Sequence, residues 1–219
     1  MYKTVHWRLE NNIGFIELNS PPANSMSKKF FEELRDITNK ALNNGQVKAI
    51  IISGRGRHFS SGADISDLLS FDEESDHQAS DYYIANSQTF KKLYTAKIPV
   101  IAAISGICLG SAMELAMACH FRISANNTIM GFPESGFHLM TGCGGSVYLS
   151  KFVEKKTMID LLMNGNNLNA AEAAQMGLID LTVSKSEVIE KAVNFALQIA
   201  ENYKQEQRIF YVQKYLKTY

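Results

Sequence analysis

A strand, a glycine-containing loop and a short helix follow one another in residues 99–118, which read PVIAAISGICLGSAMELAMA. The apolar run PVIAAIS is typical of a strand that is buried on both faces of a sheet. Gly106 and Gly110 then mark a loop, and the helix carries Glu114 as its one charged side chain. The same order recurs at 47–69. This alternation predicts an α/β fold in which crossover connections join neighbouring strands.

The remaining sequence predicts further elements of the same framework. Ser27 is placed to cap a helix that runs to about Asn44, where apolar residues recur at helical spacing. Further strands are expected near 5–9, 13–18, 119–124, 128–131 and 178–183, and further helices near 80–95, 142–151, 154–163 and 169–176. We expect one domain, with its core in 1–185 and a C-terminal helical segment in 186–219.

The composition excludes several classes of function. The 22 basic and 22 acidic residues balance, so no overall attraction to nucleic acid or to an anionic membrane is expected. Cys108, Cys119 and Cys143 lack CxxC spacing, which favours reduced thiols over disulfides or zinc ligands. No apolar run is long enough for a membrane span, and the N-terminus lacks the apolar region of a signal peptide. We therefore expect a cytoplasmic protein without a metal.

Two carboxylates in apolar surroundings point to proton chemistry. Glu114 lies among small and apolar residues, and Glu134 follows in the segment MGFPESG. Burying a carboxylate costs free energy, so such a group is expected to be paired with another group or to serve in catalysis. An apolar pocket raises a carboxyl pKa towards neutrality, where a general acid or base works best. A buried structural ion pair at Glu114 and a surface acid at Glu134 are the alternatives.

Several motifs resemble the crotonase (enoyl-CoA hydratase/isomerase) superfamily in order and in spacing. They are PANSM at 22–26, FSSGADI at 59–65, IAAISG at 101–106, LGSAMELA at 109–116, FPE at 132–134, GCGG at 142–145 and NAAEAAQMGLI at 169–179. The resemblance implies a crotonase-like spiral of ββα units, here with a shortened C-terminal helical region. It also implies a homo-oligomer, either a trimer or a dimer of trimers. We expect the apolar closing segment 208–219 to pack on a neighbouring subunit or on its own core near the acyl pocket.

The resemblance assigns roles to residues of this chain. The backbone N–H groups of Ala63 and Ser111 would form an oxyanion hole for a thioester enolate. Glu114 would activate water, and Glu134 would exchange the proton at the α-carbon. The residues expected around the substrate are Gly62, Ala63, Asp64, Ile65, Gly110 and His138. Asp64 is also interpreted as a local cap, His138 as a possible packed side chain, and His120 as structural.

The implied function is an enoyl-CoA hydratase-like lyase that needs no cofactor, with coenzyme A as part of the substrate. The acyl group would be carried by CoA or by an acyl carrier protein. An isomerase or decarboxylase of the same fold is the nearest alternative. A non-catalytic acyl-thioester-binding relative is another, but the two retained glutamates argue against it. An RNA-binding relative is disfavoured by the zero net charge.

Overall fold

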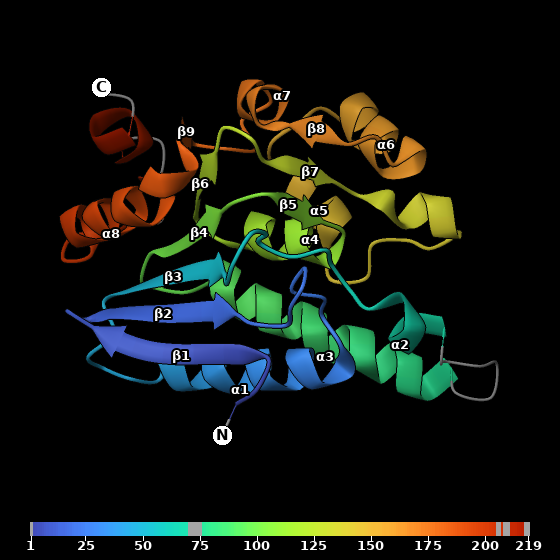
Figure 1. Ribbon diagram of the computed structural model, residues 1–219, viewed down its shortest axis with the longest axis horizontal. Helices are drawn as coiled ribbons and strands as arrows, with labels where there is room; N and C mark the ends of the chain where they lie inside the picture. Colours follow the sequence, from blue (N-terminus) through green and yellow to red (C-terminus); the bar gives the residue numbers. More distant parts are fainter. Residues whose placement is uncertain (1, 70–75, 205–206, 208–210, 217–219) are drawn as a thin grey trace.

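The computed structural model describes residues 2–69, 76–204, 207 and 211–216, and its elements are arranged around a six-stranded sheet (Figure 1). The strand order is β1-β2-β3-β4-β6-β9. These strands span Val5–Glu10, Ile13–Leu18, Ala49–Gly54, Val100–Ile104, Phe121–Ala125 and Leu181–Val183. β1 and β2 form an antiparallel hairpin, and the later pairs are parallel, as crossover connections require.

A smaller sheet contains β5, β7 and β8, in that order. These strands span Ile107–Leu109, Ile129–Gly131 and Leu168–Asn169. β5 pairs in parallel with β7, whereas β7 and β8 are antiparallel. The sheet is short, but it fixes the start of the Glu114 helix beside the segment that carries Glu134.

The helices and helical turns lie between the strands and after the last strand, β9. They are α1 (Lys28–Leu42), α2 (Ile65–Leu69), α3 (Asp76–Tyr94), α4 (Ser111–Ala118), η2 (Pro133–Phe137), α5 (Gly145–Leu149), α6 (Lys155–Asn164), α7 (Ala170–Gln175), η3 (Lys185–Glu187), α8 (Val188–Ile199) and the π-helical turn η5 (Val212–Leu216). Ser27 caps α1 by accepting a hydrogen bond from the Phe30 N–H, as predicted. None of the helices in the described residues is long and apolar enough to cross a membrane.

The large sheet separates two hydrophobic cores. Alternate residues of β3 face opposite sides, with Ile50 and Ile52 in one core and Ala49 and Ile51 in the other. The first core also contains residues of α1, α3 and α4, and the second contains residues of α8. Figure 1 shows α1 and α3 on one side of this sheet and α8 on the other. The prediction of strands buried on both faces is therefore confirmed.

The described part of the closing segment lies in the second core. Tyr211, Val212 and Leu216 are buried there with residues of α8. Part of the prediction is therefore correct, because these residues pack on the chain's own core. The predicted location near the pocket is wrong for these three residues, since none of them lines the site described below. Packing of the segment on a neighbouring subunit stays a prediction. Residues 208–210 and 217–219 lie outside the described residues.

Candidate active site

Three chain segments meet where short strands end. A parallel bridge joins Ser60 to Cys108, with the Ser60 N–H donating to Ile107 O and the Leu109 N–H donating to Ser60 O. The parallel register of β5 and β7 places Leu109 opposite Gly131. The residues that follow each strand, 61–65, 110–114 and 132–134, are therefore brought together. They carry most of the site residues that the sequence predicts.

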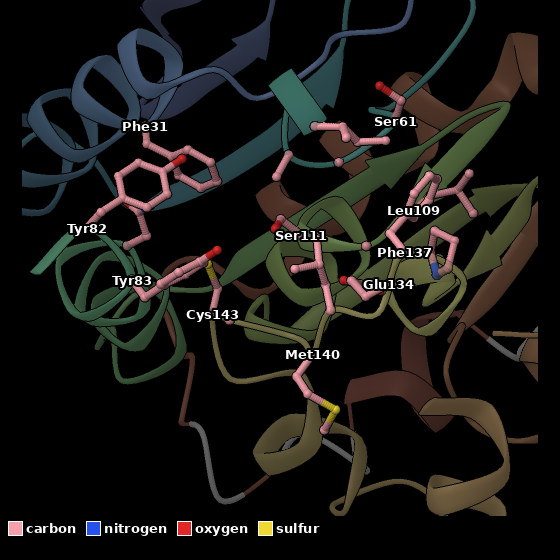
Figure 2. Close-up of a pocket in the computed structure, with 18 residues that line it drawn as sticks. Phe31, Ser61, Tyr82, Tyr83, Leu109, Ser111, Glu134, Phe137, Met140 and Cys143 are labelled. Carbon is pink, nitrogen blue, oxygen red and sulfur yellow. The ribbon is translucent and has the colours of Figure 1, made fainter. Parts of the chain in front are cut away.

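A pocket of about 290 Å³ opens at this junction (Figure 2). Its wall is mainly apolar, with contributions from α1, α3 and the segment after Glu134. The lining residues are Phe31, Ser61, Gly62, Ala63, Ile65, Tyr82, Tyr83, Asn86, Leu109, Gly110, Ser111, Pro133, Glu134, Phe137, Leu139, Met140, Gly142 and Cys143. Figure 2 shows Phe31 and Tyr82 on one side of Ser111, and Glu134, Leu109 and Phe137 on the other. A small apolar cavity with few polar groups is the usual form of a small-molecule site.

Glu134 presents a carboxylate directly to this pocket. It lies in the turn η2, and its side chain approaches Gly110 so closely that a Cβ added there would be 3.1 Å from Glu134 Oε1. Glu134 Oε2 is buried and accepts no hydrogen bond in the described part of the chain. Burial raises the pKa of Glu134 above its ordinary value, because the charged form loses hydration. This carboxyl group can therefore hold a transferable proton.

Glu114 lies behind the pocket wall and is fully buried. Its Oε1 accepts hydrogen bonds from the N–H groups of Cys143, at 2.8 Å, and Gly145, at 2.7 Å. Its Oε2 has no hydrogen-bond partner among the described residues. Burial is the largest cause that raises the pKa of Glu114 to about 7, and the nearby Glu134 carboxylate adds to it. One oxygen is thus fixed by the backbone, and the other remains available to accept a proton.

The two predicted oxyanion-hole residues lie in adjacent segments. Gly62 lies close to residues 109–111. A Cβ added to Gly62 would be 2.5 Å from Leu109 O and 3.4 Å from Ser111 N. Gly62 and Gly110 have positive φ angles of 90° and 55°, which disfavour other residues. Within the described residues, neither the Ala63 N–H nor the Ser111 N–H donates a hydrogen bond. Both amides can therefore receive an oxyanion, and the start of α4 favours negative charge.

Two of the residues predicted to contact the substrate do not line the pocket. Asp64 and His138 are absent from its lining, whereas Gly62, Ala63, Ile65 and Gly110 are present. Asp64 accepts a hydrogen bond from Ser25 Oγ at 2.9 Å and another from the Ser66 N–H at 3.0 Å, which fits the alternative of a local cap. His138 is exposed and ends η2 with φ of 58°. Contacts of Asp64 and His138 with the substrate therefore stay a prediction, and neither residue lines this pocket.

Helix α3 supplies pocket residues that the sequence did not reveal. Tyr82, Tyr83 and Asn86 line the cavity together with Phe31 of α1. The α1–α3 packing that turns these side chains inwards cannot be read from spacing alone. His120, by contrast, is structural as predicted, because its Nδ1 accepts from the Val100 N–H at 3.0 Å. The described residues contain no group of three or more His, Cys, Asp or Glu that is suited to hold a metal ion.

Comparisons with known proteins show which sequences this chain is similar to. The family model described as enoyl-CoA hydratase/isomerase matches residues 8–215. A "probable enoyl-CoA hydratase" of Bacillus subtilis is 34% identical over 190 residues, which is 86% of this chain and 73% of that protein. A "short-chain-enoyl-CoA hydratase" of Clostridium acetobutylicum is 31% identical over 195 residues, covering 88% of this chain and 74% of the relative.

Solved structures show the same fold. The crystal structure of an enoyl-CoA hydratase from Bacillus anthracis superimposes with a TM-score of 0.84 at 30% identity, covering 91% of this chain and 78% of that one. Other matches are larger multifunctional proteins of fatty acid β-oxidation, and this chain spans 27% of their length. The predicted crotonase-like fold is therefore confirmed.

Proposed function

Because the chain belongs to the enoyl-CoA hydratase/isomerase family, we propose that it is a hydratase-like lyase that adds water across the α,β bond of an acyl thioester, or removes it. The observation that carries the proposal is a pair of carboxyl groups with raised pKa values beside one apolar pocket. Each group has a buried oxygen without a hydrogen-bond partner in the described part of the chain. Such a pair can move two protons in one reaction.

The geometry supports a specific division of roles. The thioester carbonyl oxygen accepts hydrogen bonds from the Ala63 and Ser111 N–H groups, which stabilise the negative charge of the enolate. Glu114 Oε2 accepts a proton from water as the water oxygen bonds to the β-carbon. Glu134 donates its proton to the α-carbon, and the C=C π bond is lost. In dehydration each proton moves in the opposite direction, and the two carboxyl groups titrate as a coupled pair.

A substrate panel tests this function directly. Purified protein is assayed with 2-enoyl, 3-enoyl and 3-hydroxyacyl thioesters, each on CoA and on acyl carrier protein. We expect interconversion of the 2-enoyl and 3-hydroxyacyl thioesters. Conversion of 3-enoyl to 2-enoyl thioesters without hydration would instead identify an isomerase. Binding without any turnover would favour the non-catalytic alternative.

The raised pKa of Glu114 predicts how hydration depends on pH. Glu114 must be ionised to accept the proton of water, and its pKa is raised to about 7. We therefore expect kcat/KM for hydration to fall about tenfold per pH unit below about pH 7. The rate should fall again over the pH range in which Glu134 loses the proton that it donates. A profile that stays flat between about pH 5 and about pH 7, with the fold intact, would contradict this assignment.

We further propose that the chain acts without a resident cofactor, on CoA-linked or carrier-linked thioesters, in the cytoplasm. The balanced charge supports a protein that binds neither nucleic acid nor a membrane surface. A homo-oligomer, as a trimer or a dimer of trimers, is supported by exposed apolar side chains in the segment from η2 to α6. These include Phe137, Met140, Ile159 and Met163. Light scattering at micromolar concentration should give a trimeric or hexameric mass, and a monomeric mass would contradict it.

A further inference from the structure

A second cavity shares a wall with the candidate active site. Its volume is about 470 Å³, and it is lined mainly by residues of α3 and α5. Ile84 and Tyr94 of α3, together with Val147 and Tyr148 of α5, contribute aliphatic and aromatic side chains to it. The chemistry proposed above makes no use of this cavity.

The shared wall is the segment Gly142-Cys143-Gly144. Gly142 lines the active-site pocket, Gly144 lines the second cavity, and Cys143 lines both. Cys143 alone in this segment has a side chain, and the residue is only 2% exposed. The wall formed by this segment is therefore a single stretch of backbone that carries one side chain, the Cys143 thiol.

Two tyrosine rings pack on the glycines of this wall. A Cβ added to Gly142 would be 2.5 Å from Tyr83 Cδ1, and one added to Gly144 would be 2.9 Å from Tyr148 Cε2. Burial raises the pKa of both phenols, and the nearby Cys143 thiol is a further cause for each. Figure 2 shows Tyr83 beside Cys143. Cys143 is thus near a tyrosine of the active-site pocket and near a tyrosine of the second cavity.

The proposed chemistry brings the acyl chain to this wall. Glu114 would activate the water that attacks the β-carbon, and its Oε1 accepts hydrogen bonds from the Cys143 and Gly145 N–H groups. The β-carbon would therefore lie close to these residues. The acyl chain beyond the β-carbon would then run along the part of the pocket that Tyr83 and Cys143 line.

We propose that Cys143 limits the length of the acyl chain that the pocket accepts, because its side chain closes the pocket against the second cavity. The substrate class would be short-chain acyl thioesters, since the pocket in front of this wall has a volume of only about 290 Å³. A smaller residue at position 143 would join the two cavities and admit longer chains. This inference rests on the proposed function, since it assumes that the pocket binds acyl thioesters.

Binding of saturated acyl-CoAs, from butanoyl-CoA to hexadecanoyl-CoA, measures this limit without requiring turnover. Isothermal titration should show binding that tightens about fourfold for each methylene that enters the apolar pocket. In the parent protein we expect this gain to stop at a short chain length, where the chain reaches Cys143. A steady gain up to hexadecanoyl-CoA in the parent would overturn the inference.

Cys143→Ala removes the sulfur atom and keeps the backbone N–H that donates to Glu114. The chain length at which the gain stops should increase by two or more methylenes. Chains that enter the joined cavities should bind about tenfold or more tightly than they bind to the parent. An unchanged limit in a Cys143→Ala protein that keeps the melting temperature of the parent would also overturn the inference.

Variants of the second cavity separate its role from a general effect of the change at Cys143. Ile84 and Val147 are 49% and 61% exposed, and they line the second cavity but not the active-site pocket. Ile84→Trp and Val147→Trp each reduce the space in the second cavity. Either change alone should leave the limit of the parent where it is, because the wall already excludes the chain.

Combined with Cys143→Ala, at least one of these tryptophan variants should cancel the tighter binding of long chains. If both combinations keep it, the longer chain does not enter the second cavity, and the inference is wrong. A shift of the limit in either single tryptophan variant would show that the two cavities already communicate in the parent, which would contradict it as well.

The outcome is distinguishable from failure of the proposed function. Hydration of 2-enoyl thioesters by a protein without a chain-length limit would overturn this inference alone. A limit that Cys143→Ala moves, in a protein that hydrates nothing, would overturn the hydratase proposal alone. If none of the saturated acyl-CoAs binds, both are wrong.

Discussion

Glu114→Gln and Glu134→Gln should each lower kcat for hydration by about 100-fold or more, with little change in the affinity for a saturated acyl-CoA. General acid–base groups typically contribute about 10²–10⁴-fold. Glutamine keeps the size of each side chain but cannot exchange the proton. In Glu114→Gln the retained Oε1 can still accept from the Cys143 and Gly145 N–H groups. Steady-state kinetics with a 2-enoyl-CoA, combined with titration of the saturated analogue, measures both quantities.

The stability of Glu114→Gln distinguishes catalysis from structural support. The pKa of Glu114 is about 7 in the folded chain and ordinarily 4.5, so the folded state binds the proton more tightly. Stability consequently falls as pH rises from about 4.5 to about 7, and the charged carboxylate costs about 3 kcal/mol above that range. We therefore expect Glu114→Gln to be at least as stable as the parent at about pH 8. A marked loss of stability and of ligand affinity would identify Glu114 as a structural carboxylate instead.

The two carboxyl groups need not contribute equally. If Glu134→Gln abolished turnover while Glu114→Gln retained it, the chemistry would need only the proton at the α-carbon. That outcome would favour an isomerase that moves the double bond. Because the Glu134 carboxylate raises the pKa of Glu114, the double variant should cost less than the product of the single effects.

Ala63→Pro should lower kcat/KM by about 10²–10³-fold, because it removes one of the two N–H groups that we propose bind the oxyanion. The change deletes no hydrogen bond of the fold. The bridge between Met26 and Ala63 uses the Met26 N–H with Gly62 O and the Asp64 N–H with Met26 O, so the Ala63 N–H is not part of it. Stopped-flow or steady-state kinetics at several concentrations of a 2-enoyl-CoA gives the loss.

Matched variants control this result. Ala63→Gly and Ser111→Ala keep both backbone donors, so each should retain most of the activity. The Ser111 hydroxyl favours the charged form of Glu114, so its removal should raise the pKa of Glu114 and move the acid limb of the pH profile upwards. A severe loss in Ser111→Ala with the fold intact would show that the hydroxyl itself participates. Ala63→Pro with full activity and an unchanged melting temperature would refute the oxyanion role.

Much of the fold could be predicted from the chain because strong local patterns coincide with its elements. The runs that became β3 and β4 are apolar at 49–52 and at 100–104, and the structure buries both of their faces. β5 was not predicted, since its three residues lie between Gly106 and Gly110, which read as a loop. Its pairing with β7 makes it a strand. The same pairing brings Gly110 beside Glu134, which no spacing along the chain encodes.

A residue of the candidate site could be predicted from the sequence where its side chain is unusual for its surroundings. Glu114 in an apolar helix is such a case, and the structure gives its carboxylate backbone donors and a raised pKa. Asn86 and Tyr82 were missed, because polar and aromatic residues are ordinary on a helix of mixed composition. Only the packing of α3 beside α1 shows that they face the cavity. The catalytic roles themselves stay a prediction.

Product analysis in isotopic water tests the central claim most directly. The protein is incubated with a 2-enoyl-CoA in water that carries both ¹⁸O and deuterium, and the product is analysed by mass spectrometry and NMR. The proposed roles of Glu114 and Glu134 predict one ¹⁸O on the β-carbon and one deuterium on the α-carbon of a 3-hydroxyacyl-CoA. Deuterium in an unsaturated product without any ¹⁸O, or no incorporation by folded protein that binds the thioester, would contradict the account.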